Sequence, residues 1–357
     1  MEQKEKIICG IQQVGIGVTD VSESWRWYNK LLGFDLKVFD DEGVAELMLP
    51  YTGGKPQPRR AILALNPMGG GGLEIWQPKG REIRYPDDEV RLGDYGICVC
   101  KLKTNNIEKA YETAQKNGIK LLSTITNSPF GQKHFFIKDK DNNVFEFESN
   151  NFVFIKAGLP SGGVNGVTIG VSDMDKSIEF YKNLLDYDIV VGDHTGIFDD
   201  MGGVCGANNK MRRVLLRRSK TVGPLCEVLG DSQIELIQNF DIEPRKIFAN
   251  RYWGDIGYIH VCFDIRNMDI LKKKAEETGH PFVCDSGDKF DMGEANGHFS
   301  YVEDPDGTLI EFVETHKIPI IKKLGISINL NNRDNTKPLP RFITQAFKFM
   351  RVSSDKI

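Results

Sequence analysis

The sequence has no long apolar run and no strong excess of charge of either sign. None of its apolar runs is long enough to span a bilayer, and residues 1–6 lead into only a short apolar stretch, without the core of a signal peptide. The formal net charge is -4 over 357 residues, with acidic and basic residues interspersed, so no nucleic acid or other polyanion is implied as a partner. These absences favour a cytoplasmic protein with no nucleic-acid or membrane partner. We separately expect a small-molecule substrate and a monomer or a homodimer.

Paired-cysteine motifs are also absent. The seven cysteines are odd in number, and no two of them form a CxxC pair. Cys98, Cys100 and Cys262 lie inside strand-like runs. We therefore interpret the cysteines as reduced, buried thiols, which excludes a disulfide framework and a zinc knuckle.

What the sequence does have is an internal repeat. Asp20 precedes a helical pattern that contains Tyr28, and Asp173 precedes a similar pattern that contains Tyr181. The tyrosine follows the aspartate by eight residues in both copies. An aspartate at the end of a strand is suited to capping the next helix, and apolar residues three and four positions apart predict that helix. The two halves of the chain therefore have the same organisation.

Each half contains a second unit with the same elements. Helices are predicted over 106–117 and 268–278, and turns over 139–143 and 304–307 separate strand-like runs. The chain is then four units of one strand, one helix and about three more strands, over residues 10–76, 93–148, 163–238 and 256–315. We expect a first domain over 8–150, a glycine-containing linker over 151–163, a second domain over 163–316, and a tail over 317–357 that packs on the surface.

A glutamate lies between two apolar residues near the end of every unit. Because side chains alternate along a strand, each glutamate points away from its apolar neighbours. A single such triplet is typical of an exposed glutamate on a one-sided strand. Four of them favour a concave sheet that collects carboxylates, which are costly to bury unless they bind a metal or take part in chemistry. The triplets are Leu73-Glu74-Ile75, Phe145-Glu146-Phe147, Ile234-Glu235-Leu236 and Ile310-Glu311-Phe312.

Four such units in two pairs, with Asp304-Pro305-Asp306-Gly307 before the strand of Glu311, resemble the vicinal oxygen chelate superfamily. That superfamily includes glyoxalase I, extradiol dioxygenases and bleomycin-resistance proteins. The resemblance covers about residues 10–315 and implies an α+β fold. Four βαβββ modules would form two cupped mixed β-sheets, the glyoxalase-like fold, with helices outside. It also implies one divalent metal ion, held by side chains of the first and last strands of the modules.

The resemblance places a ligand set on this chain. The first-strand positions are Gln13, Asp94, Gly166 and His260, and the last-strand positions are Glu74, Glu146, Glu235 and Glu311. Gln13, Glu74, His260 and Glu311 match the ligand types of glyoxalase I. They meet in one site if the first unit pairs with the fourth, which leaves Asp94, Glu146 and Glu235 as a degenerate second site. If consecutive units pair instead, Glu235 joins His260 and Glu311. The sequence leaves both pairings open.

These ligand types suit Zn, Ni, Co, Mn or Fe as the divalent ion. Such an ion polarises a substrate oxygen, and Glu311 or Glu74 is then the candidate base, with Tyr301 orienting the substrate. Glutathione-using glyoxalase I carries arginine, arginine and asparagine where this chain has Gly17, Ile256 and Pro78. We therefore expect a metal-dependent lyase or isomerase of a small oxygenated substrate that is not a glutathione adduct. The alternatives are a non-catalytic resistance or sequestration protein and an Fe(II)-dependent dioxygenase.

Overall fold

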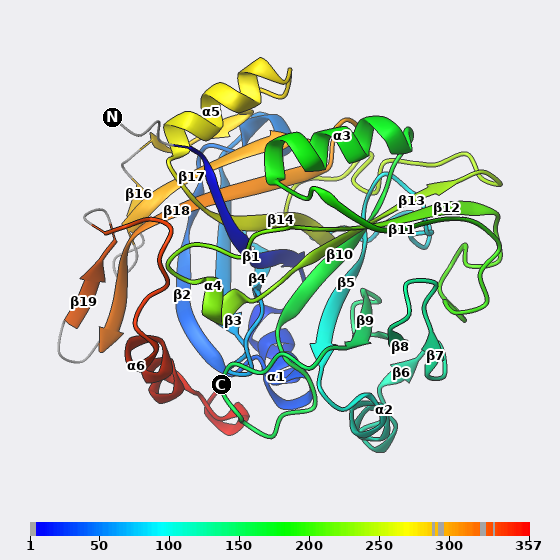
Figure 1. Cartoon of the computed structure of the whole chain (residues 1–357), viewed down its shortest axis with the longest axis horizontal. Helices are drawn as coiled ribbons and strands as arrows, with labels where there is room; N and C mark the ends of the chain where they lie inside the picture. The colour runs from blue at the N-terminus through cyan, green and yellow to red at the C-terminus, as the bar shows by residue number, and fades with distance from the viewer. Residues whose placement is uncertain (1–4, 288–289, 292–295, 322–325, 331–332) are drawn as a thin grey trace.

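A computed structural model describes residues 5–287, 290–291, 296–321, 326–330 and 333–357 (Figure 1). The strands of sheet A are β1 (Ile7–Gly17), β2 (Leu36–Ala45), β3 (Gln57–Leu65), β4 (Gly72–Pro78), β14 (Gly257–Arg266), β15 (Cys284–Asp285), β16 (Phe290–Asp291), β17 (Asn296–Glu303), β18 (Leu309–Ile321) and β19 (Ile326–Asn329). Their order is β15-β17-β18-β14-β1-β4-β3-β2, with β16 beside β17 and β19 beside β18.

Sheet B has the same plan. Its strands are β5 (Gly96–Thr104), β6 (Lys120–Leu121), β7 (Thr126–Asn127), β8 (Lys133–Lys138), β9 (Val144–Ser149), β10 (Val164–Gly170), β11 (Ile189–Gly196), β12 (Met211–Arg217) and β13 (Gln233–Asn239). Their order is β11-β12-β13-β10-β5-β9-β8-β6, with β7 beside β8. Each sheet therefore has a main path of eight strands, and the short side strands are additions that the sequence pattern did not predict. The predicted α+β fold with two cupped mixed sheets is confirmed.

The central strands of each sheet join units that are far apart in the sequence. In sheet A, β1 of the first unit pairs antiparallel with β14 of the fourth, with Gly15 opposite His260. In sheet B, β10 of the third unit pairs antiparallel with β5 of the second, with Val164 opposite Leu102. The structure thus adopts the crossed arrangement, and each sequence repeat supplies half of each sheet.

The tyrosines of the repeat join consecutive units instead. Tyr28 donates a hydrogen bond of 2.6 Å to the Asp139 carboxylate, and Tyr181 donates one of 2.9 Å to Asp304. Both aspartates lie in the hairpin turn of the next unit, and all four side chains are buried. The Asp-Tyr repeat in the sequence therefore marks an equivalent contact made twice, in which a helix of one unit is held to a turn of the other sheet.

The longer helices are α1 (Val21–Leu32), α2 (Ile107–Lys116), α3 (Met174–Leu185) and α5 (Met268–Glu277), and the shorter ones are α4 (Cys226–Leu229) and α6 (Arg341–Thr344). Asp20 and Asp173 cap α1 and α3 as predicted, each accepting a backbone N–H of the first turn. In Figure 1, α3 and α5 lie above the two sheets and α1 and α2 below. One buried apolar cluster includes residues of both sheets and of these four helices. Among the described residues, no helix has the length and apolar character to cross a membrane.

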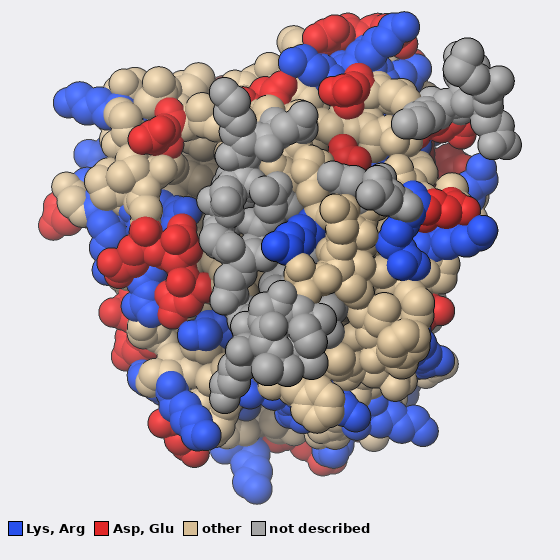
Figure 2. All heavy atoms as spheres, turned by 90° about the vertical axis from the view of Figure 1, so that its left-hand side faces the viewer, with Lys and Arg blue, Asp and Glu red and all other residues tan. Residues whose placement is uncertain are grey.

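The C-terminal tail is part of the fold. Strand β18 continues to Ile321, past the predicted end of the fourth unit. Farther on, Arg351 forms an ion pair of 2.6 Å with Asp35, and the Val352 N–H donates 2.8 Å to the Asp35 carbonyl. The chain thus returns to the start of β2. On the face shown in Figure 2, basic and acidic side chains are interspersed, in keeping with the small net charge of the whole chain.

Candidate metal centre

Four neighbouring strands of sheet A carry the predicted ligand residues. Glu311 is on β18, His260 on β14, Gln13 on β1 and Glu74 on β4, and these strands lie in that order. Gly15 lies opposite both His260 and Glu74, and Cys262 lies opposite both Gln13 and Glu311. Positions two apart on a strand share a face, so this register brings the four side chains to the same concave side. The crossed pairing of the units is what makes this possible.

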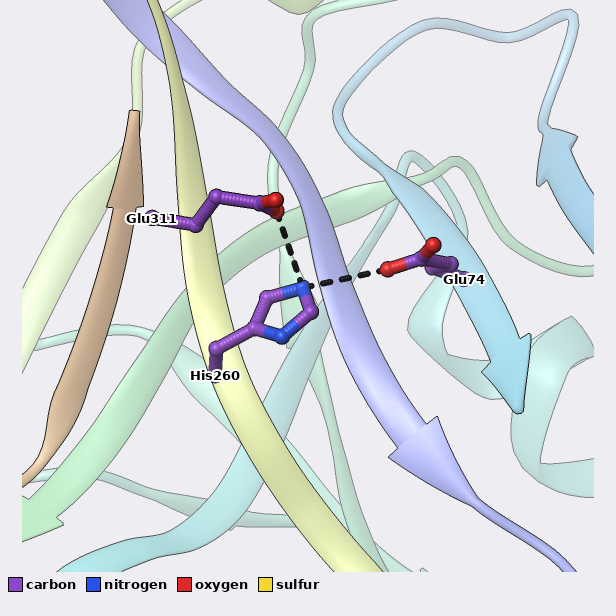
Figure 3. A group of neighbouring side chains, drawn as sticks. All are labelled: Glu74, His260 and Glu311. Atoms are coloured by element: carbon purple, nitrogen blue, oxygen red, sulfur yellow. Dashed lines mark ion pairs between the residues drawn. The ribbon is translucent and has the colours of Figure 1, made fainter. Parts of the chain in front are cut away.

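Three of these side chains converge closely (Figure 3). His260 Nε2 lies 3.2 Å from Glu74 Oε2 and 3.1 Å from Glu311 Oε2. One ligand atom from each residue can be chosen so that all three lie within 4.8 Å of one another. The His260 ring is fully buried, and the Glu74 side chain is 15% exposed. The group is therefore compact, and it is open on the Glu74 side.

Gln13 is the fourth member. Its Nε2 donates a hydrogen bond of 3.4 Å to Glu311 Oε2, so its amide lies within the group. Among the described residues, the buried Gln13 Oε1 has no hydrogen-bond partner, and the buried His260 Nε2 contacts only the two carboxylates. Buried polar atoms without partners are costly and call for an explanation, such as an ion. One imidazole, one amide oxygen and two carboxylates form a donor set that fits a divalent metal.

The electrostatics of this group favour cation binding. Burial disfavours the charged imidazolium, but the Glu311 and Glu74 carboxylates outweigh burial and raise the pKa of His260 to about 10. Burial also opposes ionisation of Glu311, yet the neighbouring His260 lowers the pKa of that carboxyl below its usual value. The site therefore holds two carboxylates that need a positive charge between them, supplied by a proton on His260 or by a metal ion.

The surrounding residues fix the His260 ring. A Cβ atom at Gly15 would lie 2.4 Å from His260 Cε1, so only glycine leaves room for the ring there. Trp253 stacks on His260 with the ring centroids 6.4 Å apart, and Tyr301 meets the ring edge-on. The Tyr301 hydroxyl is 3.5 Å from His260 Nδ1 and lies in the cup, where strand parity places it. Trp253 was missed by the sequence reasoning, although an aromatic residue beside Gly254 in the loop before the His260 strand was a usable signal.

A cavity of about 160 Å³ lies against the centre. Gln13, Glu74 and Glu311 form its polar end, and most of its remaining lining is apolar. Two parts of the wall do not come from strands of the predicted units. Helix α4 supplies Val228 and Leu229, and the tail supplies Phe347 and Met350. The tail was expected to pack on the surface, but its residues Lys317, Phe347 and Met350 also line this cavity.

The corresponding place in sheet B holds an ion-pair network. Lys101 Nζ lies 2.6 Å from both Glu146 Oε2 and Glu235 Oε2, the counterparts of Glu311 and Glu74. His134 Nδ1 lies 2.6 Å from Glu146, and Arg213 lies 2.7 Å from Glu235. Lys101 stands opposite Glu146 as Cys262 stands opposite Glu311. An ammonium group therefore lies between the two carboxylates in this cup.

The cations of this network are held in their charged forms. Burial opposes the charge of Lys101, but Glu146 and Glu235 more than compensate and raise its pKa above the usual value. His134 is likewise disfavoured by burial, and its contacts with Asp200 and Glu146 raise its pKa to about 9. The two carboxylates thus already have their counter-charges. Lys101 and Arg213 were missed by the sequence reasoning, although a charged residue inside an apolar strand was a usable signal.

Two of the ligand sets that the sequence left open are not formed in the structure. The Asp94 carboxylate pairs with Arg91 at 2.9 Å and accepts from the Arg245 N–H, so it does not join Glu146 and Glu235. Its true counterpart in the repeat is Asp255, and Val99 stands where the other copy has His260. Glu235 belongs to sheet B and pairs with Lys101 and Arg213, so the arrangement in which it joins His260 is not formed.

Comparison with known proteins gives a consistent result. The family described as "Glyoxalase/Bleomycin resistance protein/Dioxygenase superfamily" matches residues 10–147 and 163–312. Lactoylglutathione lyase of Schizosaccharomyces pombe is 25% identical over 313 residues, which cover 84% of this chain and 94% of that protein. The crystal structure of glyoxalase I from Zea mays is similar with a TM-score of 0.54 and 15% identity, over 87% of this chain and 92% of that one.

Proposed function

The chain belongs to the glyoxalase/bleomycin resistance protein/dioxygenase superfamily, and on that premise we propose that it is a metal-dependent lyase or isomerase. Its substrate would be a small oxygenated molecule that is not a glutathione adduct. The observation that carries this proposal is the convergence of Glu74, His260 and Glu311 within 4.8 Å at the polar end of a cavity. Members of this superfamily use a divalent metal, and the structure holds a possible site for one.

The proposed roles follow from the contacts. A divalent ion, when bound, supplies Lewis-acid polarisation of a substrate oxygen. Glu311 would accept a proton from one substrate carbon and return it to the neighbouring carbon, with Glu74 as the alternative base. Burial and the two glutamates raise the pKa of Tyr301 well above its usual value, so its hydroxyl keeps its proton and can donate to a substrate oxygen. Gln13 and His260 would hold the ion in place.

The absence of a glutathione clamp is supported by the same fold. A Cβ atom at Gly17 would lie 1.9 Å from the Asp255 carbonyl oxygen, so no side chain fits at that position. Ile256 is buried, and Pro78 ends β4. None of these three positions offers a cation or an amide to a tripeptide. The relative from Schizosaccharomyces pombe is named lactoylglutathione lyase. The glutathione hemithioacetal is therefore the substrate whose use would contradict this proposal.

The test uses protein loaded in turn with Zn, Ni, Co, Mn and Fe(II). We expect no dioxygen uptake with any of these ions, because one imidazole with two carboxylates differs from the two-histidine, one-carboxylate set of Fe(II) oxygenases. We also expect the methylglyoxal hemithioacetal of glutathione to show a kcat/KM no higher than that of 2-mercaptoethanol, since the tripeptide finds no clamp. Measured dioxygen uptake with iron would favour the dioxygenase. A marked preference for the glutathione hemithioacetal would contradict the inference that Gly17, Ile256 and Pro78 leave glutathione without binding contacts.

A further inference from the structure

The cavity beside the candidate metal centre has a sharply divided lining. At one end are the side chains of Gln13, Glu74 and Glu311. The rest of the wall is built from apolar side chains of sheet A, α4 and the tail: Leu36, Val38, Phe39, Leu63, Leu65, Leu225, Val228, Leu229, Phe299, Val313, Phe347 and Met350. The other polar lining residues are Gln12, Thr315 and Lys317. Of these, only Lys317 is cationic, and its side chain is exposed to solvent.

The apolar wall is held in place by contacts from several parts of the chain. The Gly70 N–H donates 2.9 Å to the Val228 carbonyl, which ties α4 to the turn before β4. The Leu339 N–H donates 2.8 Å to the Pro224 carbonyl, which ties the tail to the segment before α4. Leu36, Val228 and Phe347 pack together in one buried cluster with Phe154. Because sheet, α4 and tail are joined in this way, the apolar wall is a fixed feature of the fold.

The size and chemistry of this space select among ligands. A dry cavity of about 150 Å³ is known to hold a benzene molecule, and this one is about 160 Å³. Burying apolar surface in such a space is favourable, whereas a charged group there would lose its hydration without gaining a partner. Among the described lining residues, the exposed Lys317 is the single cation available to an anionic group.

We propose that the substrate has an apolar body about the size of one benzene ring and carries its reacting oxygens at one end. The oxygens would lie at Gln13, Glu74 and Glu311, and the ring or branched alkyl group would fill the space between sheet A, α4 and the tail. This inference rests on the proposed function, because it assumes that the polar end of the cavity holds a metal ion. It adds the class of substrate, which the ligand set alone does not specify.

Two hydroxamates test the proposal by binding alone. Acetohydroxamate and benzohydroxamate present the same pair of oxygens to a divalent ion and differ in a methyl group against a phenyl ring. With zinc-loaded protein, we expect isothermal titration to give a Kd at least about tenfold lower for benzohydroxamate, since several more buried carbons contribute. S-hexylglutathione should bind more weakly than benzohydroxamate, because its charged tripeptide has no matching lining.

A matched pair of variants locates the effect. Val38 and Val44 are both on β2, and Val38 lines the cavity whereas Val44 does not and is 50% exposed. Val38→Asp should reduce the affinity for benzohydroxamate to near that for acetohydroxamate, and Val44→Asp should leave the tenfold difference unchanged. Equal affinity of wild-type protein for the two hydroxamates would contradict the proposed substrate class but not the proposed metal centre. Failure of the protein to take up zinc would instead overturn the proposed function.

Discussion

Replacing Lys101 with methionine is expected to destabilise the protein by about 3–5 kcal/mol, the usual cost of removing one partner from a buried ion pair. The ammonium lies 2.6 Å from both Glu146 and Glu235, and all three side chains are almost completely buried. Methionine has a similar length, so the loss of stability would reflect the missing charge more than a change in packing. Urea unfolding measures this loss as a fall in the midpoint of the transition at unchanged slope.

Lys133→Met is the matched control. Lys133 pairs with Glu108 at 2.8 Å, but both side chains are more than half exposed, so its loss should leave the urea midpoint close to that of the wild type. Adding Glu146→Gln to Lys101→Met should recover part of the lost stability, because one buried cation and one buried anion are then removed together, and His134 keeps its contact with Asp200 at 3.2 Å. If Lys101→Met unfolds at the same urea concentration as Lys133→Met, the carboxylates of the second cup are not held by Lys101.

Replacing Glu311 with glutamine is expected to lower turnover by a factor of at least ~100, the low end for loss of a general base. An amide cannot accept the proton in transit, although its oxygen can still face a metal ion. The side chain keeps its shape, so the protein should still fold, but loss of the buried ion pair with His260 should lower the urea midpoint. The measurement is kcat on the first substrate found, with the Kd for zinc determined in parallel to separate chemistry from metal loss.

Glu74→Gln provides the comparison for this prediction. Glu74 faces the same His260 atom from the opposite side of the group and is the more exposed of the two carboxylates. A small effect of Glu74→Gln beside a large effect of Glu311→Gln would assign proton transfer to Glu311. Undiminished turnover in Glu311→Gln, with loss in Glu74→Gln, would move the base to Glu74.

Much of the fold could be predicted because its signals are local and repeated. The Asp20–Tyr28 and Asp173–Tyr181 spacings mark helices that the structure contains, and strand parity places Gln13, Glu74, His260 and Glu311 on one concave face. The pairing of the units could not be predicted, because both repeats contain the same types of strand. It is set by the long-range registers of β1 with β14 and of β10 with β5.

The predictions that were wrong or missing also have physical causes. The resemblance placed Asp94 at a first-strand ligand position, but it lies five residues before Val99, the counterpart of His260. In the second cup the Lys101 ammonium group lies between two carboxylates, and the sequence of its strand does not show that one of them comes from another module. The cavity wall from α4 and from Phe347 could not be foreseen, because these segments come close to β2 only in the folded chain.

The most direct test of the candidate centre is the metal content of the purified protein, measured by mass spectrometry after dialysis. We expect one divalent ion per chain in the wild type and in His194→Ala, whose histidine lies on the exposed strand β11. His260→Ala should retain none above background while remaining folded, because the imidazole is the one nitrogen ligand of the proposed set. A His260→Ala protein that keeps a full equivalent of metal, or a wild-type chain that binds two ions, would contradict a single centre built from Gln13, Glu74, His260 and Glu311.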